Sequence, residues 1–352
     1  MRERKKDRCR CIRGLLRSRF APRLFPDNDF GTSPADRVKS AAIRGKRRRA
    51  GIIRNVNVEG LRSAQKVAFV FPGGSSRCAF QVGAVERLLA LGIRPAMTIG
   101  VSAGSWNAAI VAARAEHRIR YYWRSFVRMP HLDLRNLLVE HSPFRYAHNH
   151  RRTFARFVGD RLRAPDALPC YISVTRLRDR QGFLIGAHEV EQPVDLLLAA
   201  NYLPPFYTRT PLVRGERYGD GGITDNAPYE LAFAHGCDAV VLMPVKGESE
   251  GGIYKSTRDV DHVIPAAYRD RVVVIRPRHR LPYSFTERRW EKLAELMTLG
   301  DLRTREVLLG ERHPETDVRA AGDSPSVRVL KLWRRVRGST AAGPVPAEPA
   351  QP

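Results

Sequence analysis

The run Gly100-Val101-Ser102-Ala103-Gly104 places a serine between two glycines in the pattern Gly-x-Ser-x-Gly. In this pattern the serine stands at a sharp strand-to-helix corner, where its hydroxyl is exposed and can attack an acyl carbon. The flanking sequence fits such a corner, because residues 97–99 can end a buried strand and residues 106–114 are Ala-rich like a buried helix. Since Gly, Ser and Ala are common residues, the pentapeptide alone is weak evidence. The interpretation therefore depends on two further segments.

The first of these is a glycine loop, Pro72-Gly73-Gly74-Ser75-Ser76-Arg77-Cys78. It follows an apolar run at residues 66–72 that suits a buried strand, and it precedes a helix expected from Phe80 to about Gly92. The backbone N–H groups of such a loop converge and bind an anion, either a phosphate or the oxyanion of a tetrahedral intermediate. The loop lacks the Gly-Lys-Ser/Thr ending of phosphate-binding loops, and no acidic residue lies at 95–100 to bind a ribose. An oxyanion site is favoured, and a purely structural turn stays open.

The second segment contains a carboxylate, in Asp220-Gly221-Gly222, followed by Asp225-Asn226-Ala227-Pro228. An isolated Asp-Gly pair is most simply a β-turn. The three segments occur in the order glycine loop, serine corner, aspartate. Both of the first two lie between a strand and a helix, and in parallel sheets ligands bind at the carboxyl ends of the strands.

The remaining pattern predicts an α/β fold, a three-layer sandwich with a central mostly parallel sheet flanked by helices. We expect helices at 117–127, 151–162 and 193–202, and strands at 168–177, 182–185, 238–245 and 271–275. Near the C-terminus we expect one helix ending at Gly300 and a second, capped by Asp301, running to Leu309. Residues 247–252 are expected to form a mobile loop. The aromatic stripe of residues 121–126 lies among arginines, and ordinary core packing with a charged face is favoured over a lipid-facing role.

Charge is concentrated at the N-terminus. The 352 residues carry a net charge of +25, and about half of it lies in residues 1–54, which hold 18 Lys or Arg against 5 Asp or Glu. We expect residues 1–62 to be a basic, disordered segment that can contact an anionic membrane, with a plain solvated tail as the alternative and nucleic acid as the less favoured partner. Residues 338–352 are expected to be a second disordered tail. No apolar run has the length of a signal peptide or membrane span, so a cytoplasmic protein with peripheral membrane contact is expected.

The five cysteines form no regular framework and no metal-binding pattern, so free thiols are expected, with no metal and no cofactor. A hydrophobic content of 43% is sufficient for a large core. We place a catalytic core at residues 66–235 and assign residues 236–337 to strands and helices that complete the same domain.

As a set, the three segments resemble the patatin-like phospholipases, lipid acyl hydrolases with a Ser-Asp dyad. The resemblance implies a phospholipid or other acyl-ester lipid as substrate, Ser102 as nucleophile and Asp220 as the base. It implies an oxyanion hole at Gly73, Gly74 and Ser75. The supporting positions that match the family are Arg77, Gly100, Gly104, Gly221, Gly222 and Asn226.

Two residues depart from the family's Gly-Gly-Gly-x-Arg/Lys-Gly loop, since Ser75 replaces the third glycine and Cys78 the last. Ser75 keeps a backbone N–H, provided that its backbone angles suit a residue with a Cβ atom. Cys78 puts the packing of the following helix in question.

A dyad requires Asp220 itself to accept the serine proton. Because an ordinary aspartate has a pKa of about 3.9, we expect Asp220 to be partly buried and hydrogen-bonded to Ser102. Two alternatives stay open. One is an α/β-hydrolase with a Ser-His-Asp triad, for which His235 and His262 are the histidines to test, and the other is an inactive protein that binds membrane or nucleic acid.

Overall fold

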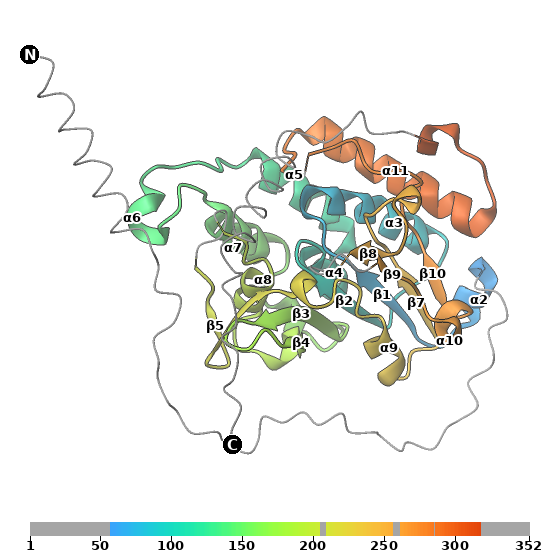
Figure 1. The fold of residues 1–352 in the computed structure, drawn as a ribbon, viewed down its shortest axis with the longest axis horizontal. Helices are drawn as coiled ribbons and strands as arrows, with labels where there is room; N and C mark the ends of the chain where they lie inside the picture. Colours follow the sequence, from blue (N-terminus) through green and yellow to red (C-terminus); the bar gives the residue numbers. More distant parts are fainter. Residues whose placement is uncertain (1–56, 205–208, 256–260, 285, 318–352) are drawn as a thin grey trace, which may run out of the picture. The chain divides into compact units, whose positions relative to one another are not determined.

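The computed structural model describes residues 57–204, 209–255, 261–284 and 286–317. All of these lie in one compact unit, residues 51–352 (Figure 1). The expectations for residues 1–56 and 338–352 lie outside the described residues. In the described part, no helix is long and apolar enough to cross a membrane.

A mixed sheet forms the centre of the fold, with strand order β10-β7-β1-β2-β3-β6-β5 and β4 paired to β3. The strands are β1 Val67–Phe71, β2 Met97–Val101, β3 Cys170–Arg176, β4 Gly182–Gly186, β5 Leu212–Val213, β6 Glu216–Asp220, β7 Ala239–Leu242 and β10 Val272–Val274. The pairs from β10 through β3 are all parallel, whereas β4, β6 and β5 pair antiparallel. Two short strands, β8 Tyr254–Lys255 and β9 Asp261–His262, pair with each other. The expected α/β class with a mostly parallel sheet is confirmed.

Helices cover both faces of this sheet (Figure 1). Successive strand residues point to opposite faces of the sheet, so the hydrophobic core consists of two clusters. Phe69 and Val241 belong to the larger cluster, and Val70 and Val240 belong to the smaller one. The large cluster includes α2 Val58–Ser63, α3 Ala79–Ala90, α4 Gly104–Ala112, α5 Ile119–Arg128, α7 Tyr146–Phe157, α8 Pro193–Ala200 and α11 Trp290–Leu309. The smaller one includes α9 Glu230–Ala234 and α10 Ala266–Arg269. The short helix α6 Asn136–Glu140 lies between α5 and α7.

The C-terminal helix differs from the expectation. Residues 290–309 form one helix, α11, that continues through Gly300. A Cβ atom at Gly300 would lie 1.9 Å from the carbonyl oxygen of Phe80 on α3. Gly300 is therefore a site of close helix packing, and the prediction that it ends a helix was wrong.

Regular structure is also present in two shorter segments for which the sequence predicted none. The end of the segment expected to be disordered to residue 62 contains α2, whose first turn is capped by Asn57 Oδ1 accepting from the Gly60 N–H at 2.9 Å. Residues 248–250, expected to be mobile, form a 3₁₀ turn in which the Glu250 carboxylate accepts from the Gly247 N–H at 2.9 Å.

Candidate active site

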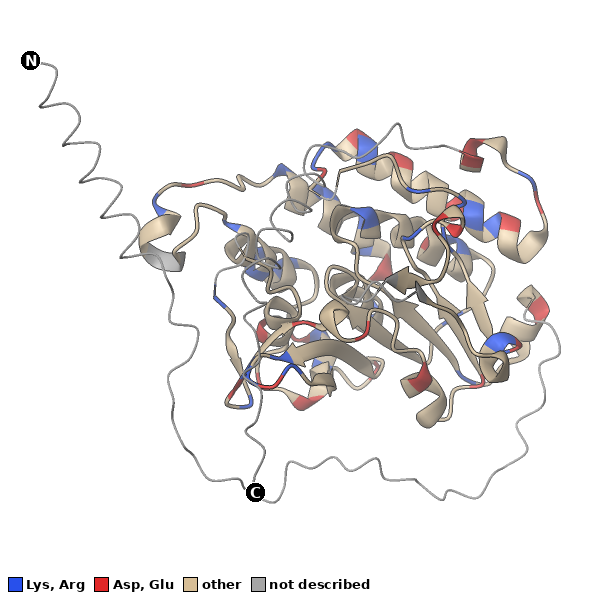
Figure 2. Cartoon of the chain, in the orientation of Figure 1, with Lys and Arg blue, Asp and Glu red and all other residues tan. Residues whose placement is uncertain are grey.

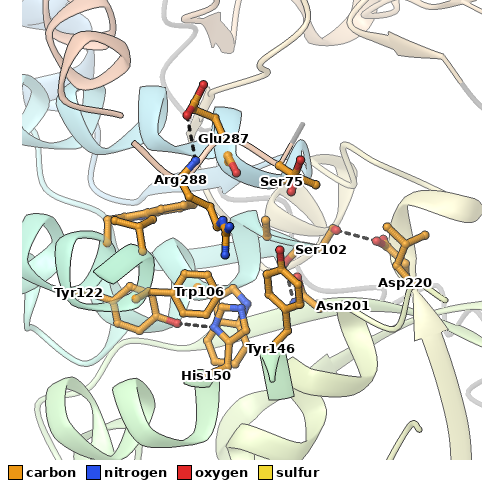
Figure 3. Close-up of a pocket in the computed structure, with 17 residues that line it drawn as sticks. Ser75, Ser102, Trp106, Tyr122, Tyr146, His150, Asn201, Asp220, Glu287 and Arg288 are labelled. Carbon is orange, nitrogen blue, oxygen red and sulfur yellow. Dashed lines mark hydrogen bonds between the residues drawn. The ribbon is translucent and has the colours of Figure 1, made fainter. Parts of the chain in front are cut away.

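Sheet register brings Ser102 and Asp220 together. Val101, the last residue of β2, pairs with Ser173 of β3, and Asp220, the last residue of β6, pairs with the next β3 residue, Val174. The strands β2 and β6 therefore end over the same part of β3. The Ser102 hydroxyl donates a hydrogen bond to Asp220 Oδ2 at 2.5 Å (Figure 3).

Ser102 itself occupies the strained corner expected of its motif. Its φ angle is +50°, in the left-handed region that residues with a Cβ atom seldom adopt. The corner stays close-packed because Gly104 lies against β1, where a Cβ atom would be 2.2 Å from the Phe71 carbonyl oxygen. Gly100 lies similarly close to Ser105, where a Cβ atom on Gly100 would be 2.5 Å from the Ser105 Cα. The Ser105 N–H donates to the Ser102 carbonyl oxygen at 2.9 Å at the start of α4.

Asp220 is held by three hydrogen bonds. Its Oδ1 accepts from the Gly222 N–H at 2.8 Å, its Oδ2 accepts from Ser102, and its carbonyl oxygen accepts from Thr175 Oγ1 at 2.9 Å. Burial raises the pKa of Asp220 from 3.8 to about 6, although the bonds from Ser102 and Gly222 favour the charged form. Gly221 lies over β3, where a Cβ atom would be 2.3 Å from the Ser173 carbonyl oxygen. The carboxylate is thus both fixed in orientation and more basic than an ordinary aspartate.

The glycine loop lies directly beside Ser102, since a Cβ atom at Gly73 would be 2.7 Å from the Ser102 Cβ. The Gly73 N–H, expected as an oxyanion donor, instead donates to Asn226 Oδ1 at 2.7 Å. Among the described residues, the N–H groups of Gly74 and Ser75 have no hydrogen-bond partner. Ser75 also lines the pocket at Ser102. Gly74 and Ser75 therefore have free N–H donors, while Asn226 holds Gly73 in place.

Both departures from the glycine pattern are accommodated. Ser75 has a φ of +54°, the left-handed conformation for which glycine is better suited, so its backbone is strained. Cys78 is fully buried in the large core cluster, and its thiol lies 3.6 Å from the Pro72 carbonyl oxygen. The helix α3 begins at the next residue without interruption.

A buried polar network, which was not predicted from the sequence, fixes the loop and the corner. Asn107 Nδ2 donates to the Cys78 carbonyl oxygen at 3.0 Å and to Gln81 Oε1 at 2.9 Å. Gln81 Nε2 in turn donates to the Pro72 carbonyl oxygen at 2.8 Å. On the other side, Asn201 Nδ2 donates to the Ser102 carbonyl oxygen at 3.0 Å. A signal was present, because Gln81 and Asn107 are amides within apolar helical runs and a buried amide requires partners.

A cavity of about 80 Å³ opens beside Ser102 and Asp220. Its wall is largely aromatic, formed by Trp106, Tyr122, Trp123, Phe126, Tyr146 and His150. At the opposite side, Arg288 lines the cavity and its guanidinium points into it, while its backbone N–H donates to Glu287 at 3.0 Å (Figure 3). The arrangement suits a molecule with an apolar part and an anionic or polar part.

None of the candidate histidines is placed to act on Ser102. The His262 ring stacks on Tyr254 at a centroid distance of 4.2 Å, and the His235 ring lies tilted against Tyr171 at 4.7 Å. Neither histidine lines the cavity. His150 does line it, but it shares a 2.9 Å hydrogen bond with the Tyr122 hydroxyl and stacks on Trp106. Burial lowers the pKa of His150 well below its usual range.

Arg77 does not line the cavity. Burial lowers its pKa, and its Nε atom has no hydrogen-bond partner among the described residues. In the part of the chain that the structure describes, no group of His, Cys, Asp and Glu side chains is arranged to hold a metal ion.

Comparison with known proteins finds a match to one family model. Residues 69–233 match the family model described as patatin-like phospholipase. Over 60 residues the chain is 40% identical to the mouse protein named 1-acylglycerol-3-phosphate O-acyltransferase Pnpla3, a stretch that covers 16% of this chain and 14% of that protein. Among solved structures, VipD from Legionella pneumophila aligns with a TM-score of 0.43 at 12% identity, covering 78% of this chain and 76% of the other.

Proposed function

We propose that this protein is a serine lipid acyl hydrolase working through a Ser102–Asp220 dyad. The proposal is supported by the match of residues 69–233 to the patatin-like phospholipase family model. The observation that carries the proposal is the 2.5 Å hydrogen bond from the Ser102 hydroxyl to Asp220 Oδ2. A serine hydroxyl is a weak nucleophile unless a neighbouring base takes its proton. Asp220 is the base in contact with it.

In the first step, Ser102 Oγ attacks the ester carbonyl carbon and its proton passes to Asp220 Oδ2. Asp220 suits this task because burial raises its pKa to about 6, closer to neutral pH than an ordinary aspartate. The Gly222 N–H, bonded to Oδ1, keeps Oδ2 directed at the serine.

The negative charge that develops on the carbonyl oxygen is stabilised by backbone donors. We assign this role to the N–H groups of Gly74 and Ser75, since the Gly73 N–H is bonded to Asn226. Loss of one such donor typically costs about 2.7–4 kcal/mol in the transition state. Asn226 and Gly73 are then positioning residues that hold the loop against Ser102.

The first step is complete when the alcohol leaves with the proton held by Asp220 and the acyl chain remains as an ester on Ser102. The second step releases the acyl group. A water molecule then attacks the acyl carbon and gives a proton to Asp220, which passes it to Ser102 Oγ as the free acid departs, so that the serine hydroxyl and the carboxylate are both restored. Water is the only reactant that these two steps require besides the ester substrate, and the proposal includes no metal or cofactor.

The cavity supports a lipid ester as substrate. Its aromatic wall suits the acyl chain, and Arg288 can bind a phosphate or carboxylate on the substrate. The aromatic wall together with the Arg288 guanidinium therefore supports a phospholipid or other acyl-ester lipid as substrate.

Hydrolysis of p-nitrophenyl butyrate tests the proposal. Wild type should turn it over, Ser102→Ala should fall to background, and Asp220→Asn should fall by at least about a hundredfold, each variant being checked for folding by circular dichroism. His235→Ala and His262→Ala should keep the wild-type rate. An Asp220→Asn variant as active as wild type would exclude the dyad, and loss of activity in either histidine variant would favour a triad.

A further inference from the structure

Four exposed leucines cluster in one segment. Leu132, Leu134, Leu137 and Leu138 are 60%, 76%, 45% and 87% exposed. They lie in residues 129–145, which connect α5 to α7 and include α6; we name this segment the leucine loop. Figure 1 shows it extending away from α5 and α7. Clustered apolar side chains on a surface mark a site of interaction.

The base of the leucine loop is tied together, so the leucines are held outward. The Asp133 N–H donates to the Pro143 carbonyl oxygen and the Arg145 N–H donates to the His131 carbonyl oxygen, both at 2.9 Å. Asn136 Nδ2 adds bonds to the carbonyl oxygens of Ser142 and Phe144, at 3.0 and 2.9 Å. These bonds hold the two arms of the loop as a pair.

Beside the leucine loop is a basic groove of about 680 Å³ between α5 and α7. Four arginines line it, Arg124, Arg128, Arg152 and Arg156. Among the described residues, none of the four has an acidic partner, and basic residues are visible along α5 and α7 in Figure 2. Guanidinium groups bind phosphate through paired hydrogen bonds.

We propose that the leucine loop and the adjoining arginine groove form a docking surface for an anionic lipid membrane. The leucines enter the interface while the arginines bind lipid phosphates. A second copy of this chain is a poorer occupant, because it would bring the same unpaired arginines face to face. This surface would also serve the proposed site, since α5 and α7, at the two ends of the loop, supply Phe126 and Tyr146 to the cavity at Ser102.

The test is flotation with vesicles of equimolar phosphatidylglycerol and phosphatidylcholine, using the full chain with Ser102→Ala so that no lipid is hydrolysed. Adding Leu134→Ser and Leu138→Ser should weaken binding at least about tenfold. The matched control, Leu212→Ser with Val263→Ser, removes two exposed apolar side chains elsewhere, 58% and 66% exposed, and should stay within about twofold of its parent. Arg124→Gln with Arg128→Gln should weaken binding to anionic vesicles. Adding about 0.5 M NaCl should then reduce the binding of this variant less than it reduces the binding of its parent.

Equal binding by the leucine variant and its parent would overturn the proposal. So would a leucine-dependent dimer in sedimentation without vesicle binding, which would identify a self-association surface. If Arg47→Gln, Arg48→Gln and Arg49→Gln abolish binding while the leucine variant does not, the N-terminal segment is the membrane contact and the proposal fails. Hydrolysis of soluble p-nitrophenyl butyrate by the leucine loop variant, with Ser102 intact, should equal wild type, which separates this result from a failure of the dyad.

Discussion

Asp220 should make the folded protein less stable as the pH rises. Its pKa is about 6 in the folded chain and 3.8 for an ordinary aspartate. The folded state therefore binds this proton more tightly than the unfolded state does. The resulting stabilisation is fully present below about pH 4 and is lost as the pH rises through 6. A shift of this size corresponds to about 3 kcal/mol at neutral pH.

The variant Asp220→Asn isolates this contribution, because an amide of the same shape has no proton to lose. Its oxygen can still accept from the Gly222 N–H, which bonds Asp220 Oδ1 at 2.8 Å. Urea unfolding of both proteins from pH 4 to 8 gives the difference between their free energies of unfolding. We expect the variant to gain about 2.4 kcal/mol relative to wild type between pH 4 and pH 8, while losing esterase activity.

A difference in unfolding free energy that does not change with pH would mean that Asp220 titrates as an ordinary aspartate, and would refute the raised pKa. A difference that changes in the opposite direction would mean that the hydrogen bonds from Ser102 and Gly222 outweigh burial. The same titration should appear in kcat/KM, which should rise with pH through about 6 as the base loses its proton.

Three further substitutions test how the site and its support are built. Asn226→Ala removes the acceptor of the Gly73 N–H and should lower kcat about tenfold to a hundredfold with a small change in KM; steady-state kinetics with unchanged kcat would contradict the positioning role. Ser75→Gly keeps the backbone donor and removes strain at a φ of +54°, so its rate should stay within about threefold of wild type, whereas a large loss would mean that the Ser75 side chain takes part. Gly300→Ala should lower the free energy of unfolding by about 2 kcal/mol or more through its contact with Phe80, measured beside Thr298→Ala on the exposed face of the same helix, and equal values would show that α3 and α11 can separate at no cost.

The residues that came together as expected share a local requirement. Ser102 and Asp220 each stand beside glycines, because the chain must turn sharply and pass close to a neighbouring strand at both places. Such requirements leave a pattern in a few consecutive residues. The strands β1, β2 and β7 were also predictable, since both faces are buried and the sequence is continuously apolar.

What could not be predicted depends on partners far away in the chain. Asn226 was expected as a family position, but its bond to Gly73 joins residues 153 positions apart. Glycine is common at helix ends, so the sequence predicted an end at Gly300. Only the close approach of α3 shows that this glycine is required for helix packing instead. The leucine loop has no repeating pattern of apolar residues, so its exposed face becomes visible only when α5 and α7 are in place.

The central claim is that Asp220 activates Ser102 directly, and covalent labelling by a fluorophosphonate tests it most directly. Mass spectrometry of the digested protein should find one phosphonyl group, on the peptide that contains Ser102. The labelling rate should fall by at least about a hundredfold in Asp220→Asn and stay unchanged in His150→Gln. Labelling of Asp220→Asn at the wild-type rate, or no labelling of Ser102 in the folded wild type, would contradict the account.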